Sequence, residues 1–182
     1  NLGLSLQASG EIAQAIRQYQ AALEIDPKFV PAQGNLGTAM MAQGAFESAI
    51  NAFLKTLKLQ PGNYITFLNL GRAYKENGDF QAASDAFSKV ISMQPEFSEA
   101  HNDLGLTLYG QGKLENALKS YQKAVDLNPN YADARREGIQ HVAEVRHHIE
   151  RMLSVVLHCL RVTRRRWREA RILREDGEGL DE

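Results

Sequence analysis

The stretch that decides the fold is Val30–Asn63, which reads VPAQGNLGTAMMAQGAFESAINAFLKTLKLQPGN. Apolar residues recur at helical spacing through Leu36 and stop at Gly44, the residue type preferred just after a helix end. A second periodic run starts near Phe46 and ends before Pro61, because proline lacks the amide hydrogen that another turn would need. The stretch therefore predicts two helices joined by a tight turn.

Outside this stretch the same pattern returns every 34 residues. The Leu-Gly pair at residues 36–37 recurs at residues 2–3, 70–71 and 104–105. Four unrelated helix pairs would not keep five columns in register, so the pattern indicates a repeat array. The other four columns are small, aromatic, proline and glycine: Ala15, Ala49, Ala83 and Ala117; Tyr19, Phe53, Phe87 and Tyr121; Pro27, Pro61, Pro95 and Pro129; Gly10, Gly44, Gly78 and Gly112.

Small residues stand where the two helices of one hairpin must approach each other. Gly37 and Ala49 are expected to leave room for the ring of Phe53, so that each hairpin closes around one aromatic side chain. These columns resemble those of the tetratricopeptide repeat (TPR) family, and the resemblance covers residues 1–131. It implies an all-α fold, a right-handed solenoid of helical hairpins. Beyond the repeats we expect a C-terminal helical extension.

The resemblance divides the array into one partial and three full repeats. Their bounds are Asn1–Phe29, Val30–Asn63, Tyr64–Phe97 and Ser98–Tyr131. The first repeat lacks its opening five residues and starts in the middle of a helix. We therefore expect either a fragment of a longer chain or a natural start that precedes Asn1.

By the same resemblance, the first helix of each hairpin lines a concave face on which extended peptides bind. A polar residue precedes each Leu-Gly pair, and this asparagine ladder resembles the repeats of the O-linked N-acetylglucosamine transferases. An asparagine amide can pair with both the N–H and the C=O of a passing peptide bond. Further residues of that face follow at helical spacing. The expected peptide-binding groove comprises Asn35, Thr38, Met41, Asn69, Arg72, Lys75, Asp103, Leu106 and Tyr109, with Asn1 as the first member of the ladder.

Two other interpretations of these polar residues stay open. TPR proteins that bind chaperone tails hold a terminal carboxylate with basic and asparagine residues, which Arg72 and Lys75 approximate here beside the ladder. However, Gly34 and Thr38 occupy the places of a lysine and an asparagine in that clamp. Alternatively, each ladder amide bonds only to a neighbouring helix pair or to water.

The last fifty-one residues have a different composition. All eight lysines lie at or before Lys123, whereas eleven of the thirteen arginines lie between Arg135 and Arg174. No proline or glycine interrupts residues 139–176, which predicts a long helical segment. We expect residues 132–149 to cap the array, residues 150–174 to form an arginine-rich amphipathic helix, and residues 175–182 to form an acidic tail. Both an engineered origin and a genuine family extension are compatible with this change.

An apolar stripe on this segment needs a partner. A second copy of the chain, the surface of the array itself and another protein are the candidates. The formal charge of residues 132–174 is +6, which is compatible with a calmodulin-type target, a nuclear localisation patch or binding to an anionic surface, although we favour a solvated arginine face. The expected self-association residues are Ile149, Met152, Leu153, Val156, Leu160 and Trp167.

Composition excludes several classes of protein. Lysine plus arginine total 21 against 22 acidic residues, so a globally basic nucleic-acid-binding protein is not expected. The lone Cys159 cannot form an internal disulfide, and residues 1–10 do not resemble a secretory signal, so an intracellular, cytoplasmic location is expected. The longest apolar run, residues 152–162, is too short and too interrupted to span a membrane.

Catalytic and metal-binding motifs are also missing from the sequence. Glu144 and His147 form a single Glu-x-x-His, whereas di-iron helical bundles need two. There is no glycine-rich phosphate loop and no paired-cysteine zinc site. We expect no cofactor, no metal and no catalysis, and predict a protein–protein interaction scaffold that binds a protein or peptide partner. The alternatives are a substrate-recruiting arm of a larger enzyme such as a glycosyltransferase, and an engineered or fused oligomeric assembly.

Overall fold

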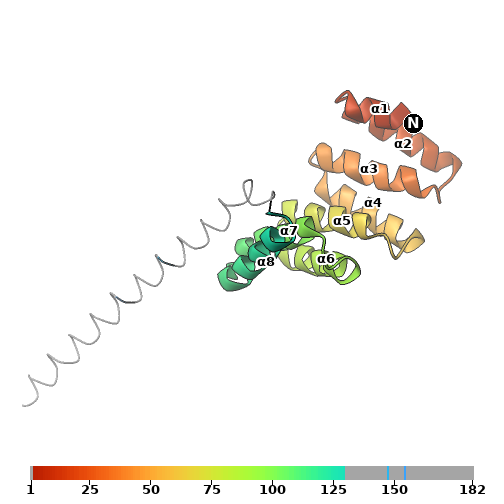
Figure 1. The fold of residues 1–182 in the computed structure, drawn as a ribbon. Helices are drawn as coiled ribbons and strands as arrows, with labels where there is room; N and C mark the ends of the chain where they lie inside the picture. The colour runs from red at the N-terminus through yellow and green to blue at the C-terminus, as the bar shows by residue number, and fades with distance from the viewer. Residues whose placement is uncertain (1, 130–146, 148–153, 155–182) are drawn as a thin grey trace, which may run out of the picture. The chain divides into compact units, whose positions relative to one another are not determined.

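The computed structural model describes residues 2–129, His147 and Ser154 (Figure 1). Within residues 2–129 all regular structure is helical, which confirms the all-α prediction. The eight α-helices are α1 (Leu2–Ala8), α2 (Ile12–Ile25), α3 (Val30–Ala42), α4 (Phe46–Leu59), α5 (Tyr64–Glu76), α6 (Phe80–Met93), α7 (Ser98–Gly110) and α8 (Leu114–Leu127).

Each pair of helices corresponds to one repeat of the sequence. Helix α3 ends at Ala42, and the backbone at Gly44 has a φ of 79°, a conformation that glycine adopts without the strain that a Cβ would cause. Helix α4 ends at Leu59, two residues before Pro61. The helix-turn-helix unit predicted from the 34-residue pattern is therefore confirmed.

The two helices of each hairpin approach closely around one aromatic ring. A Cβ atom placed on Gly37 would lie 2.6 Å from Cε1 of Phe53, and one on Gly71 would lie 2.7 Å from Cε1 of Phe87. Both rings are buried, with Phe53 only 1% exposed. The glycine of the Leu-Gly pair is thus needed for packing, because a methyl group there would displace the ring at the centre of the hairpin.

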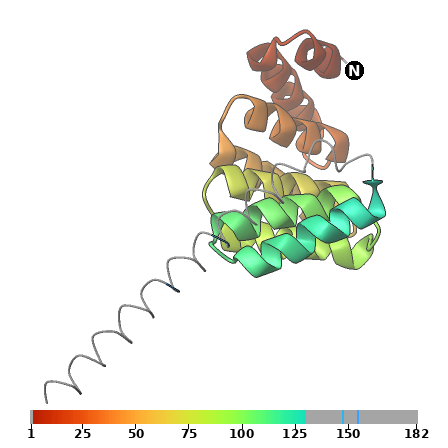
Figure 2. The ribbon, with the colours of Figure 1, turned by 60° about the vertical axis from the view of Figure 1, so that its left-hand side comes forward.

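The hairpins stack in chain order, as the colour sequence from α1 to α8 shows in Figures 1 and 2. Each helix packs mainly against the helices before and after it. In addition α3 touches α5 and α5 touches α7, whereas the second helices α4, α6 and α8 make less contact with one another. The first helices α3, α5 and α7 therefore lie side by side on one face of the array.

Several predictions fall on residues that the structure does not describe. These are the capping helix, the arginine-rich helix, the acidic tail and the stripe from Ile149 to Trp167, of which only His147 and Ser154 lie among the described residues. They remain predictions. In the described part of the chain, no helix combines the length and apolar character that crossing a membrane requires.

Candidate functional site

The face of the array that α3, α5 and α7 form carries the residues predicted for the groove. We call it the first-helix face and define it by the ladder residues Asn35, Asn69 and Asp103, one from each helix. Asn1, the other ladder residue, lies outside the described part of the chain. The first-helix face has two distinct halves, an uncharged half at α3 and α5 and a charged half at α5 and α7.

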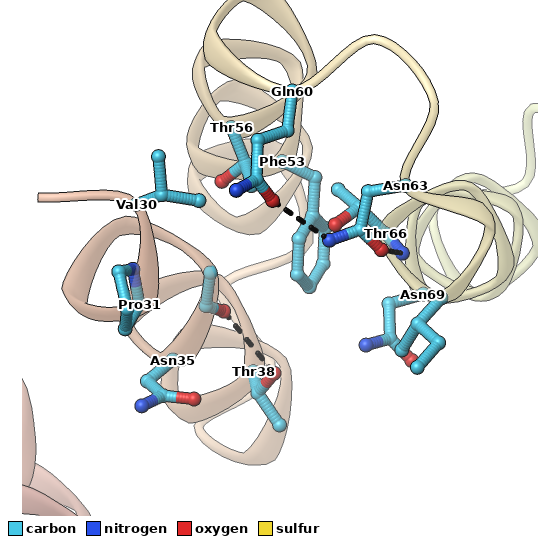
Figure 3. A pocket seen from close by; sticks show the side chains of 12 residues that line it. Val30, Pro31, Asn35, Thr38, Phe53, Thr56, Gln60, Asn63, Thr66 and Asn69 are labelled. Atoms are coloured by element: carbon cyan, nitrogen blue, oxygen red, sulfur yellow. Dashed lines mark hydrogen bonds between the residues drawn. The ribbon is translucent and has the colours of Figure 1, made fainter. Parts of the chain in front are cut away.

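The uncharged half contains an open cavity of about 280 Å³. Asn35 and Thr38 approach it from α3, Asn69 approaches from α5, and Phe53 and Thr56 of α4 lie behind (Figure 3). None of the lining side chains carries a formal charge. The twelve lining residues are Val30, Pro31, Gly34, Asn35, Thr38, Phe53, Thr56, Gln60, Asn63, Ile65, Thr66 and Asn69.

Several polar groups around the cavity already have partners in the protein. The hydroxyl of Thr56 donates to the carbonyl of Ala52 at 3.0 Å, and that of Thr38 donates to the carbonyl of Gly34 at 3.2 Å. The side chain of Asn63 accepts from the backbone N–H of Thr66 at 3.0 Å, which caps the N-terminus of α5. It also donates to Gln60 Oε1 at 3.2 Å. These bonds fix the walls of the cavity.

The two ladder amides differ from those groups. Asn35 and Asn69 are half-buried, and neither side chain has a hydrogen-bond partner among the described residues (Figure 3). Each amide offers two donor hydrogens and an acceptor oxygen. The uncharged half of the first-helix face therefore presents unused hydrogen-bonding capacity from two successive repeats.

The charged half is organised around Arg72, which joins two repeats. Its Nε donates to Asp103 Oδ2 at 2.8 Å, and its Nη2 donates to Glu99 Oε1. Burial alone would lower the pKa of the guanidinium, but the bond to Glu99 and the charge of Asp103 outweigh burial and raise the pKa. One guanidinium thus faces two carboxylates, and this ion cluster carries a net charge of −1.

The remaining predicted groove residues have other surroundings. Lys75 Nζ lies 3.4 Å from Glu76 Oε1, so its charge is also partly balanced. Met41 packs against the core cluster that contains Phe53 and Leu70. Leu106 and Tyr109 are half-buried on α7. The assignment of these nine residues to one groove stays a prediction.

Sequence reasoning missed two features of this face. Glu99 belongs to the ion cluster, and its position four residues before Asp103 on α7 was the available signal. The second feature is the cavity that Gly34 opens. The sequence indicated it, because the equivalent positions of the next two repeats carry the larger side chains of Leu68 and Asn102. Among the described residues no group of histidine, cysteine and acidic side chains is arranged to hold a metal ion.

Comparison with known families identifies the repeats. Three family profiles, each described as tetratricopeptide repeat, match residues 6–65, 52–83 and 68–132. Among curated proteins, none matches the chain significantly.

Several solved structures are similar to the chain. A crystal structure of MamA has a TM-score of 0.75 at 26% identity, covering 81% of this chain and 85% of that chain. The Sgt2 TPR domain from Aspergillus fumigatus has a TM-score of 0.63 at 24% identity, with coverages of 67% and 82%. The first TPR of Spaghetti (RPAP3), bound to the HSP90 peptide SRMEEVD, has a TM-score of 0.60 at 22% identity, with coverages of 64% and 91%. The last two similarities concern the fold alone.

Proposed function

Because residues 6–132 belong to the tetratricopeptide repeat family, we propose that the chain is a non-catalytic scaffold whose first-helix face binds an extended polypeptide. One observation carries the proposal. Asn35 and Asn69 come from equivalent positions of successive repeats, border one open cavity, and have no partner among the described residues. A repeat array that exposes such amides along one face is suited to an elongated guest.

The amides suit a polypeptide backbone in particular. A peptide bond presents one N–H donor and one C=O acceptor, and an asparagine side chain matches both at once. Such pairing does not depend on the guest's side chains, so the ladder would supply affinity rather than sequence preference. An unpaired amide that becomes buried in a complex costs about 1–3 kcal/mol, which makes the two asparagines measurable contributors.

An acidic guest has less support. The peptide held by the RPAP3 fragment, SRMEEVD, contains three acidic side chains. In this chain Arg72 is already engaged by Asp103 and Glu99, and Lys75 lies beside Glu76. A guest carboxylate at this position would have to displace two carboxylates of the protein itself. We therefore propose a guest that is neutral where it meets Asn35 and Asn69.

The test starts from a random-sequence peptide library displayed on phage and selected on the immobilised full chain. Enriched peptides are then titrated by calorimetry against the wild type and the Asn35→Ala/Asn69→Ala variant. We expect the double variant to weaken binding by about 1–3 kcal/mol, the cost of leaving guest amides unpaired. Its melting temperature should stay close to that of the wild type, since neither amide bonds to the described part of the protein.

The matched control changes two asparagines elsewhere. Asn51 on α4 and Asn116 on α8 are exposed and belong to second helices. Asn51→Ala/Asn116→Ala removes the same chemical groups, and peptide affinity should not change. Equal affinity for the wild type and the ladder variant, or a selection that enriches no peptide, contradicts the proposed function.

A further inference from the structure

The uncharged cavity exists because one position of the repeat has lost its side chain. Gly34 in the second repeat corresponds to Leu68 in the third. Leu68 is 5% exposed and belongs to the core cluster with Val90 and Ala100. At Gly34 the corresponding space is open: a Cβ atom there would meet only Cγ2 of Thr56, at 3.9 Å.

The comparison of Gly34 with Leu68 also indicates how large the open space beside Gly34 is. Leu68 fills the equivalent place one repeat later, and it belongs to the same core cluster as Val90. Val90 stands in α6 at the position that Thr56 has in α4. The cavity volume of about 280 Å³ includes this space and the opening between α3 and α5. A side chain as large as leucine can therefore enter from outside where the protein supplies none.

The chemistry of the cavity selects the kind of side chain. Its inner wall presents the ring of Phe53 and the methyl group of Thr56, whose hydroxyl proton is bonded to Ala52. No lining residue could balance a charge, and burying an unpaired carboxylate or ammonium is costly. The lining groups with free hydrogen-bonding capacity, Asn35 and Asn69 among them, are uncharged.

From these observations we propose that the cavity at Gly34 is a specificity pocket for one aliphatic side chain, valine, isoleucine or leucine, of a bound polypeptide. This inference rests on the proposed function. The amides of Asn35 and Asn69 hold the guest backbone on both sides of the pocket, and the aliphatic side chain occupies the space that Leu68 fills in the next repeat. The pocket thus sets the register of the guest, which the ladder alone cannot do.

The deciding variant is Gly34→Leu, which gives the second repeat the side chain of the third. The matched control is Gly34→Ala, since a methyl group at this position is in ordinary contact with Thr56. Both variants are made in the full chain and titrated with the peptides that the phage library enriches on the wild type. Each peptide is also synthesised with its aliphatic residues replaced singly by glycine or aspartate.

We expect the enriched peptides to share an aliphatic residue at one position, whose replacement weakens binding about tenfold or more. Gly34→Leu should weaken the binding of the parent peptide by a similar factor. It should not further weaken the binding of the glycine-substituted peptide. Gly34→Ala should bind nearly as tightly as the wild type. Helical circular dichroism verifies the fold, and Gly34→Val replaces the leucine variant if that one does not fold.

Two outcomes overturn the inference separately from the proposed function. If peptides depend on Asn35 and Asn69 but bind Gly34→Leu as tightly as the wild type, the pocket proposal is wrong and the groove proposal stands. The pocket proposal is also wrong if the position that the peptides share is acidic or basic. If no peptide depends on the two asparagines, both the proposed function and the pocket are wrong.

Discussion

At the scale of single residues, Asn102 is the least satisfied side chain of the described part. It is fully buried on α7, and neither Nδ2 nor Oδ1 has a hydrogen-bond partner among residues 2–129. Buried amides in folded proteins are nearly always paired, because each unpaired group retains its desolvation cost. In the 34-residue column Asn102 takes the place of Leu68, so an apolar residue is compatible with this position of the hairpin.

Replacing Asn102 by leucine should stabilise the array. The variant removes two unsatisfied polar atoms and restores the residue of the preceding repeat, so we expect the free energy of unfolding to rise by about 1–3 kcal/mol. Urea denaturation followed by circular dichroism measures it. Asn102→Ala is the control: it removes the amide but leaves a small void, and should gain less. A lower stability of the leucine variant would show that the amide is needed where it is.

The sequence predicted apolar contacts within one hairpin better than ion pairs between repeats. The small and aromatic columns predicted the contact between Gly37 and Phe53, because that contact lies within one hairpin and repeats four times. The bond from Arg72 to Glu99 joins different repeats and occurs once, so no column marks it. Asp103 stays a predicted groove residue, and its buried carboxylate accepts a hydrogen bond from Arg72, which the sequence did not predict.

At the scale of secondary-structure elements, the turns inside the hairpins have one geometry. In the third repeat the N–H of Gly78 donates to the carbonyl of Lys75 at 3.1 Å, and the N–H of Asp79 donates to that of Tyr74 at 2.8 Å. This pair of bonds closes the C-terminus of α5. The glycine has a φ of 87°, where a Cβ would clash with the backbone. The glycine column therefore predicted the turn correctly, for a local backbone reason.

Gly78→Ala should destabilise the protein by about 1–2 kcal/mol, because alanine is strained at this positive φ. A methyl carbon added to Gly78 would meet no heavy atom within 4 Å beyond its chain neighbours, so the loss would come from the backbone and not from a tertiary clash. Gly62→Ala provides the control: its site is equally open, but its φ is not positive. That variant should change stability by no more than about 0.5 kcal/mol in thermal or urea unfolding. Equal losses for the two variants contradict the explanation.

At the scale of the whole molecule, the order of stacking follows the order of the chain. Contacts join neighbouring helices, so the architecture could be predicted from one repeat and its period. The features of the first-helix face could not be predicted in this way, because they depend on which side chains of two different repeats meet. The cavity at Gly34 and the ion cluster at Arg72 are both of this kind.

We predict that the full chain associates with itself through the apolar residues of the stripe from Ile149 to Trp167, all of which lie outside the described residues. Val156→Glu/Leu160→Glu would bury unpaired carboxylates in such a contact, at a cost of several kcal/mol, and should give a folded monomer. Light scattering at micromolar concentrations measures the mass. His147→Glu/Ser154→Glu, at two exposed positions, adds the same side chains and should leave association intact. A wild-type chain that is monomeric across this range contradicts the prediction.

The uneven charge along the first-helix face also gives the array a direction. The neutral pocket at Gly34 lies at one end of this face, and the carboxylates of Glu99 and Asp103 lie at the other. A polypeptide has distinct ends, so a guest whose aliphatic and basic residues match the two sites fits in one orientation only. Reversing it would place its cation in the pocket, where nothing balances the charge. The proposed groove therefore has a polarity, with a neutral end at α3 and an acidic end at α7.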